Sequence, residues 1–462
     1  MEGVEELENE DLDLGVLSPL RIEWSEKVFQ LVADVLNRVH GMDKPMRFWK
    51  LITEEHVRAM VTRLEILSAV DISEPPPLFA VNSYSVPGFR DRVRAGLRQL
   101  RDYIRSRNDI SHTERVLKDN NILISGFDKG DSIFQETGGT KLPEGALFAF
   151  LKGDSKKRKF VNRIAADSKD QFERNVIRML PKIVVEHFDA IYTSIPLHRP
   201  EDKVFHVQGM FRFSFQQFVI AKYIGVGAKL IWYQDGAFIG EFISKYSRYI
   251  THSVADEYRT WGWKLTEKDV PWKAYPLKKL AGKYNLHRSK NVKKYDLLLC
   301  YPKFRDNSRS YYVELTNKML SGLSGEREWN IIARPQPSKG NVKRDNKIDF
   351  ITDERISVSD TSRSMPEEMA LSRCVVQMNV PATNFPECIY VDQPVTGILR
   401  NNQPTDIIKP HYNFFLSVGV LHSDMESLIA HLNRVNIEEW WAEVIIKPEY
   451  QAFKREFTGC IM

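Results

Sequence analysis

The sequence predicts an α/β fold with two Rossmann-like, doubly wound domains, a helical section before the first and helices at the end of the second. A chain of 462 residues is too long for one ordinary core. Short apolar runs, typical of parallel strands buried on both faces, alternate with segments of helical periodicity. The alternation stops in a stretch rich in lysine, 276–294, and then restarts. This interruption favours two domains joined by one linker.

Residues 1–20 are acidic and are expected to form a disordered leader, so the first domain is assigned to 21–275 and the second to 295–462. In the first domain, periodicity predicts helices at 24–67 (with a break at Pro45), 90–107 (strongly basic), 172–185 (interrupted by Pro181) and 211–224. Strands are predicted there at 121–126, 188–194 and 230–233, and a basic surface turn at 152–159.

In the second domain, apolar runs predict strands at 295–301, 330–334, 355–359 and 374–378. Helices are predicted at 312–323, from about 383 onward, and across 423–457.

The charge balance excludes a strongly basic nucleic-acid-binding protein. Lys and Arg outnumber Asp and Glu by 66 to 61, a net charge of +5 spread over the whole chain. The four cysteines form no C-x-x-C pair and are expected to be reduced and mostly buried, which suits a cytoplasmic protein. The acidic start of the sequence is not expected to be a secretory signal, and no stretch is expected to cross a bilayer.

The most informative turn follows the apolar run Leu230–Tyr233. Gln234, Asp235 and Gly236 place polar atoms just past the carboxyl end of that predicted strand. In open α/β sheets this edge is where ligands bind, so Asp235 is a candidate for contact with a substrate. The alternative is that Asp235 only caps a helix that starts near Phe238.

Two loops of the second domain carry candidate ligand-binding groups. Arg334, at a predicted strand end, could grip a phosphate or carboxylate with two hydrogen bonds, together with the polar side chains of Gln336 and Ser338. The alternative is a proline turn with a surface arginine. Thr383 and Asn384 could bind an anion at a helix start. Glu387, one turn later, could accept hydroxyl groups, unless Thr383 and Glu387 only cap that helix.

Two Rossmann-like domains joined by one linker are the GT-B arrangement of nucleotide-sugar glycosyltransferases, in which the active site lies in a cleft between an acceptor-side N-terminal domain and a nucleotide-sugar-binding C-terminal domain. Residues 374–457 resemble bacterial surface-polysaccharide transferases. The resemblance rests on the Thr-rich helix start with its glutamate, the segment His411–Phe415 and the pair Trp440-Trp441. It extends over most of 45–457.

Within that group, Gln234–Phe238 is similar to the turn of retaining β-Kdo transferases of capsule, O-antigen and lipopolysaccharide assembly, although Ala237 interrupts the match. Those enzymes use CMP-linked 3-deoxy-manno-octulosonic acid (Kdo). The resemblance implies that Asp235 is a nucleophile that holds the sugar covalently, so that two inversions give net retention. Related enzymes often carry His-Pro where this chain has Gln336-Pro337, so Arg334 would have to supply the positive charge.

Three further residues are candidates for roles in this reaction. His252 could act as an acid or base, although a lone histidine is more often structural. Glu136, beside Gly138 and Gly139, is a candidate base for the acceptor hydroxyl, and Ser194, at a predicted strand end, is a candidate sugar ligand. No cluster has convincing metal spacing, so a metal-independent reaction without a cofactor is expected.

Two alternatives stay open. A UDP- or GDP-sugar donor would need additional cationic groups near Arg334, and the sequence supplies candidates in Arg305, Lys339, Arg344 and Lys347. A non-catalytic scaffold of an envelope-assembly complex could keep the same fold. For a lipid-linked acceptor, the basic segments 90–107 and 152–159 could dock on the inner membrane.

Overall fold

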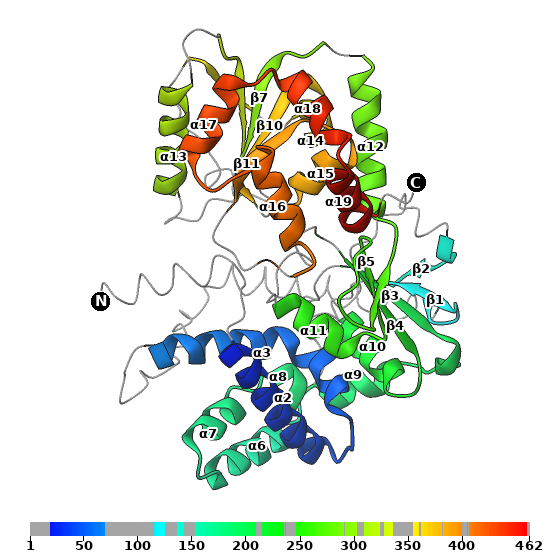
Figure 1. Ribbon diagram of the computed structural model, residues 1–462. Coiled ribbons are helices and arrows are strands. Elements are labelled where there is room, and N and C mark those ends of the chain that lie inside the picture. Colours follow the sequence, from blue (N-terminus) through cyan, green and yellow to red (C-terminus); the bar gives the residue numbers. More distant parts are fainter. Residues whose placement is uncertain are drawn as a thin grey trace, which may run out of the picture. The chain divides into compact units, whose positions relative to one another are not determined.

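The structure, a computed structural model, describes residues 19–69, 115–124, 136–142, 153–208, 215–234, 236, 246–290, 292–302, 309–323, 328–335, 354–359, 362–380, 382–399, 404 and 406–459. The described chain divides into two compact units. Residues through 234 together with 246–258 form unit 1, and Gly236 with 259–459 forms unit 2. Two six-stranded sheets with flanking helices confirm the two-domain α/β fold (Figure 1).

The first sheet has the strand order β2-β1-β3-β4-β5-β6. Four of its six strands, β2, β1, β3 and β4, are paired in parallel. The order reverses between β1 and β3, which is the point where a doubly wound sheet leaves room for a ligand. The strands are β1 (Asn121–Leu123), β2 (Thr140–Lys141), β3 (Val204–Gln208), β4 (Lys229–Tyr233), β5 (Glu257–Thr260) and β6 (Asp269–Pro271).

Helices of unit 1 pack mainly on one another around an aromatic cluster. The rings of Phe48, Trp49, Phe188 and Tyr192 lie against each other, and Trp49 Nε1 donates to Asn37 Oδ1 at 2.9 Å. The helices are α2 (Pro19–His40), α3 (Met46–Ala69), α6 (Ser155–Asp167), α7 (Gln171–Arg178), α8 (Lys182–Val185), α9 (Phe188–Ser194), α10 (Phe215–Ile224) and α11 (Tyr246–Val254), with a 3-10 turn, η2 (Pro200–Asp202).

The second sheet is parallel throughout, in the order β12-β11-β10-β7-β8-β9. The chain runs from β7 out to β9, crosses back to β10 beside β7, and continues to β12. This is the Rossmann strand order, with its reversal between β7 and β10. The strands are β7 (Tyr295–Cys300), β8 (Ile331–Arg334), β9 (Ile356–Val358), β10 (Ser372–Val380), β11 (Val395–Leu399) and β12 (Leu421–His422).

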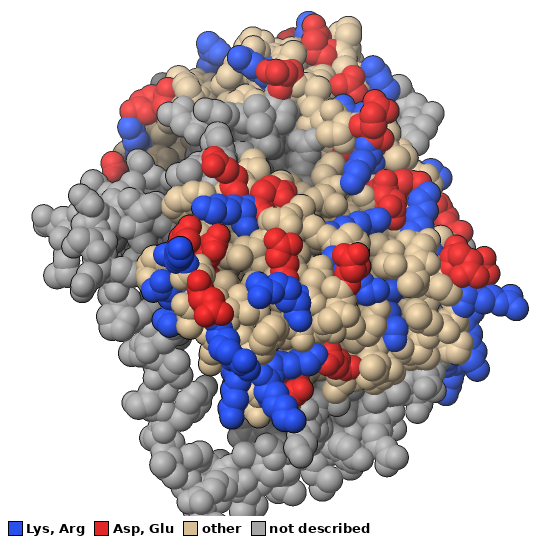
Figure 2. Space-filling view, turned by 90° about the horizontal axis from the view of Figure 1, so that it is seen from below, with Lys and Arg blue, Asp and Glu red and all other residues tan. Residues whose placement is uncertain are grey.

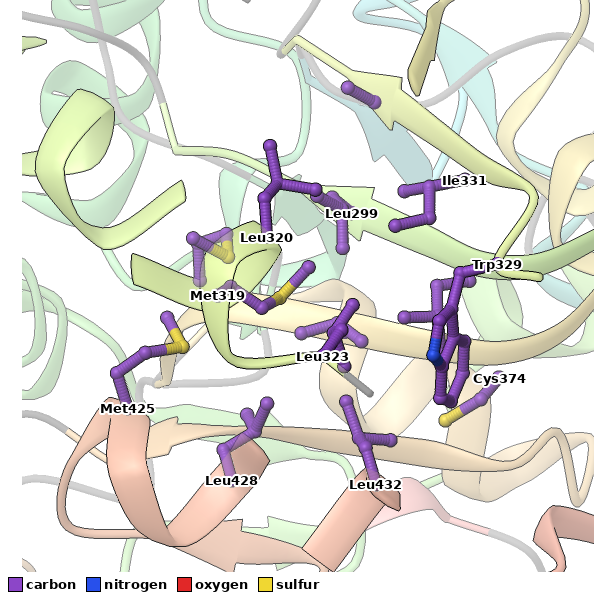
Figure 3. Close-up of a cluster of buried hydrophobic side chains, with 14 of the residues drawn as sticks. Leu299, Met319, Leu320, Leu323, Trp329, Ile331, Cys374, Met425, Leu428 and Leu432 are labelled. Atoms are coloured by element: carbon purple, nitrogen blue, oxygen red, sulfur yellow. The ribbon is translucent and has the colours of Figure 1, made fainter. Parts of the chain in front are cut away.

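Helices cover both faces of the second sheet (Figure 1). On one face, side chains of α13 and α17 meet those of β7, β8 and β10 in a buried core, in which Met319, Leu323 and Leu428 are directed toward Leu299 (Figure 3). On the other face lie α12, α14, α15 and α19. The helices are α12 (Tyr275–Arg288), α13 (Arg309–Gly322), α14 (Met365–Leu371), α15 (Asn384–Tyr390), α16 (Lys409–Ser417), α17 (Met425–Arg434), α18 (Ile437–Ile445) and α19 (Pro448–Thr458).

The linker predicted at 276–294 is wrong, because most of it is helix α12, which packs on α14 and α15. Leu277, Leu280 and Tyr284 recur at helical spacing and are buried. Pro276 stands in the first turn, where proline needs no hydrogen-bond partner. Lys278, Lys279 and Lys283 are exposed on this helix, so the segment resembles a linker in composition alone.

Two predictions in unit 1 are also wrong. Residues 188–194 form helix α9 instead of a strand, because a short apolar run suits a buried helix equally well. The expected basic turn at 152–159 is largely helix α6, which Asp154 caps by accepting from Lys156 N at 2.9 Å. The predicted break at Pro181 is confirmed, since α7 ends at Arg178 and α8 begins at Lys182. The basic segment 90–107 and the leader, apart from Pro19 and Leu20 at the start of α2, lie outside the described residues.

Candidate functional site

The candidate site lies at the carboxyl edge of the second sheet, beside its reversal point. Cys300 ends β7 and is paired in register with Arg334 on β8 and with Gln377 on β10, and Gln377 is paired with Gly397 on β11. These four residues therefore form one row across four neighbouring strands, called here the polar row. Their neighbours along the strands fill the α13/α17 core, so by alternation the polar row faces the side of α14 and α15.

Arg334 is held from one side by buried acceptors. Its Nη1 donates to Glu368 Oε2 of α14 and to the Arg363 carbonyl oxygen at 3.1 Å, and it lies 3.5 Å from Ser359 Oγ. Ser359 Oγ donates in turn to Glu368 Oε1 at 2.5 Å. The side chains of Arg334 and Glu368 are only 9% and 1% exposed. Arg334 is therefore a buried, paired arginine, and the alternative of a surface arginine is wrong.

The start of α15 approaches the polar row through Asn384, whose side chain lies close enough to the Cys300 thiol to lower its pKa. Burial raises the pKa of Cys300 to about 12, so this thiol stays neutral and is not a nucleophile at ordinary pH. Burial also raises the pKa of the Glu387 carboxyl to about 8. Near neutral pH Glu387 is mostly protonated and can donate as well as accept a hydrogen bond.

The anion site expected at this helix start has fewer backbone donors than predicted. The N–H of Phe385 donates to Ala382 O at 3.0 Å and that of Glu387 to Thr383 O at 3.3 Å, while Pro386 has no N–H. The alternative role for Thr383, as a side-chain cap, is also wrong. Thr383 occupies the N-cap position in a helical conformation and its side chain makes no capping hydrogen bond.

Polar atoms without partners lie on β10. Gln377 Nε2 and Asn379 Oδ1 are buried, and no hydrogen-bond partner is present for either in the described part of the chain. A Cβ on Gly397 would lie 2.8 Å from Gln377 Cβ, so glycine leaves the space that the Gln377 side chain occupies. Buried polar groups normally have partners, so these two are suited to hydrogen bonds with a ligand.

Asp235, Gln336 and Ser338 lie outside the described residues. Ser194 is in helix α9 and its Oγ donates to Ile191 O at 2.7 Å, so its predicted place at a strand end is wrong.

His252 and Glu136 both belong to unit 1. His252 lies on α11, with its ring 4.6 Å from that of Tyr258. Glu136 is exposed. Their proposed acid and base roles stay predictions.

Sequence analysis missed Cys300, Ser359, Glu368 and Gln377 as site residues. A signal was present for Gln377 and Cys300, because each places a polar atom inside an apolar run at the end of a predicted strand. No pattern marks Glu368, which meets Arg334 only through folding.

Within the described ranges, no three His, Cys, Asp or Glu side chains are gathered so that they could hold a metal ion. In the same residues, no helix combines the length and the apolar character that crossing a bilayer requires.

The fold is that of an α/β protein with a polar row beside the reversal point of a Rossmann-type sheet, the place where ligands bind in such sheets. The chain matches the model of the LIC12162 family transferases over residues 138–459, and it belongs to this family. The protein is therefore a transferase.

Solved structures with a similar course of the chain have low identity to it. They include the wall teichoic acid polymerase TagF (12% identity, 81% of this chain and 94% of that chain, TM-score 0.32). The trehalose 6-phosphate synthase of Burkholderia multivorans is similar at 10% identity (72% and 94%, TM-score 0.40), and MurG of Acinetobacter baumannii at 11% (74% and 95%, TM-score 0.35). No curated protein shows significant sequence similarity to the chain.

Proposed function

We propose that this transferase is a glycosyltransferase that moves a sugar from a nucleotide-sugar donor to a glycan acceptor. The nucleotide would bind at the carboxyl edge of the second sheet. The observation that carries the proposal is the buried Arg334, in the same row as the unpartnered amide of Gln377 and near the reversal between β7 and β10. An arginine at that edge suits the phosphate of a nucleotide.

The donor that fits the Asp235 turn is CMP-Kdo or a related CMP-linked ulosonic acid. In this scheme a carboxylate oxygen of Asp235 attacks the anomeric carbon, the bond from that carbon to the phosphate oxygen breaks, and CMP leaves. An acceptor hydroxyl then displaces Asp235, and a base takes the hydroxyl proton. Such a donor carries a single phosphate, which one arginine can bind with two hydrogen bonds.

The test is mass spectrometry of the intact protein after incubation with CMP-Kdo, generated in situ, without acceptor. We expect a mass gain of one Kdo residue for the natural protein and none for Asp235→Ala or Asp235→Asn. CMP release without an adduct would reject Asp235 as the nucleophile but would still support a transferase.

Absence of both adduct and CMP release, even with candidate acceptors, would reject this donor. A binding screen with CMP, UDP and GDP would then separate another donor from the scaffold alternative.

For a lipid-linked acceptor, we propose that α6 contributes to contact with an anionic membrane surface. Lys156, Lys159 and Arg163 are exposed on this helix, whereas Lys157 is paired with Asp189. Acidic side chains are interspersed among the basic ones on the face drawn in Figure 2, so the expected attraction is weak and sensitive to salt. Sedimentation with liposomes containing anionic lipid at low salt tests it, and no binding would remove this proposal.

A further inference from the structure

The Arg334 guanidinium offers one side to the protein and leaves the other side available. All three of its described contacts, to Glu368, Ser359 and the Arg363 carbonyl, are made by the single nitrogen Nη1. In the described part of the chain, no hydrogen bond is present to Nε or Nη2. Neither nitrogen is among the buried atoms that lack a partner, so both have access to solvent.

Nε and Nη2 form one edge of the planar guanidinium, and their N–H groups point in nearly the same direction. This edge matches two oxygens of a phosphate group, as in two parallel N–H···O bonds. Since the arginine side chain is only 9% exposed, this edge is largely shielded from solvent. Water would therefore screen a phosphate bound there only weakly, and its attraction to the guanidinium would be stronger than at an exposed site.

Glu368 and Ser359 determine which edge is available. The Glu368 carboxylate is 1% exposed; one of its oxygens accepts from Arg334 and the other accepts from Ser359. Ser359 follows β9 and Glu368 lies on α14, so two separate segments fix the carboxylate. A guanidinium anchored through Nη1 to a fixed carboxylate cannot turn freely about its last bonds.

We propose that Glu368 and Ser359 are positioning residues, which hold Arg334 so that its Nε/Nη2 edge receives a phosphate oxygen pair of the nucleotide. This inference rests on the proposed nucleotide-sugar function and assigns residues to its donor site. The ligand chemistry is an oxyanion with two available oxygens. Gln377 Nε2, two strands away in the polar row, is a second donor for the same ligand.

The experiment compares a nucleotide with the matching nucleoside by isothermal titration calorimetry. CMP and cytidine are used first, then UDP with uridine and GDP with guanosine. The variants are Glu368→Gln, Ser359→Ala and Arg334→Lys in the full chain. Glu368→Gln keeps the shape of the side chain but removes its charge. Ser359→Ala is the mild variant, because it keeps the ion pair between Arg334 and Glu368. Arg334→Lys keeps the positive charge but loses the two parallel N–H groups of the guanidinium.

The matched control is Glu438→Gln. Glu438 also accepts from an arginine of β10, Arg373, but near the amino end of that strand. Circular dichroism and thermal unfolding of every variant show that it is folded. If Glu368→Gln does not fold, Ser359→Ala alone carries the test.

We expect Glu368→Gln and Arg334→Lys to bind the nucleotide about 10- to 100-fold more weakly, and Ser359→Ala less so, with nucleoside affinity unchanged. Glu438→Gln should bind like the natural protein. A merely structural role would weaken nucleoside and nucleotide together, or neither.

Nucleotide affinity unchanged in folded Glu368→Gln and Ser359→Ala would overturn the inference while leaving the proposed function intact. Failure of the natural protein to bind any of the three nucleotides would overturn the proposed function, and with it this inference.

Discussion

Replacement of Gly419 by alanine tests the packing of unit 2 at a position where a side chain has no room. Gly419 follows α16 with φ at +75°. A Cβ there would lie 2.4 Å from Cε1 and 2.5 Å from Nδ1 of His431. The His431 ring cannot easily move away, because it is 5% exposed and packs 4.7 Å from the ring of Trp440. Both backbone and packing therefore oppose the substitution.

The expected loss has two parts. Left-handed backbone costs an alanine about 1–2 kcal/mol, and an extra carbon forced into a packed interior costs about 1–3 kcal/mol. Gly419→Ala should therefore destabilise unit 2 by roughly 2–5 kcal/mol. The two parts separate in the background His431→Ala, where the ring is gone and only the backbone cost of about 1–2 kcal/mol should remain.

The assay is hydrogen exchange of peptides from β10 and β11 under increasing denaturant, because two units can unfold separately and a single melting curve would mix them. Gly282→Ala, at an exposed position of α12, is the control. A Cβ there meets no atom within 4 Å, and alanine in a helix should stabilise by about 0.5–1 kcal/mol. An equal loss from Gly419→Ala with and without the His431 ring would refute the packing argument.

Three further predictions follow from unit 2. The Glu387 pKa of about 8 lies above its usual 4.5, so this group contributes stability below pH 4.5 that is lost as the pH rises through 8. Glu387→Gln should reduce this dependence of the unfolding free energy on pH, measured by urea titrations at several pH values. An unchanged dependence would contradict the prediction. Burial, with His422 and Arg434 nearby, lowers the pKa of His431 to about 4. Its contribution to the free energy of unfolding is therefore present above pH 6.5 and lost as the pH falls through 4. His431→Phe should not show this loss of stability when it is titrated with acid. Leu428→Ala, in the core of Figure 3, should cost about 2–5 kcal/mol in denaturant unfolding. Ile446→Ala, at a position 74% exposed, should cost less than about 0.5 kcal/mol, and equal losses would show that the core is misassigned.

The elements that sequence patterns predicted best are the buried strands. The runs at β4, β7, β8 and β10 are mainly apolar, as expected of strands covered on both faces, and each was placed within a few residues. Several short or partly polar strands were missed, although the short strands β1 and β9 were predicted. β3 contains His206 and Gln208, and β11 contains Thr396 and Gly397, so neither reads as an apolar run.

Arg334 was predicted at the end of a strand, and the structure places it there, in register with Cys300. Its predicted role as a ligand-binding group stays a prediction. The predicted place of Ser194 at a strand end was wrong, because residues 188–194 form helix α9, and a seven-residue apolar segment fits a strand or a helix equally well.

By itself, the sequence determined the α/β class, the two-fold repetition of the strand–helix pattern and the polar strand ends, since all of these depend on neighbours along the chain. Only the tertiary structure decided what those strand ends face. Arg334 and Glu368 are 34 residues apart, and Cys300 meets Gln377 through the register of β7 with β10. Such pairings depend on strand order and register, which local periodicity does not encode, and they decide whether an arginine is a surface charge or a buried, paired group.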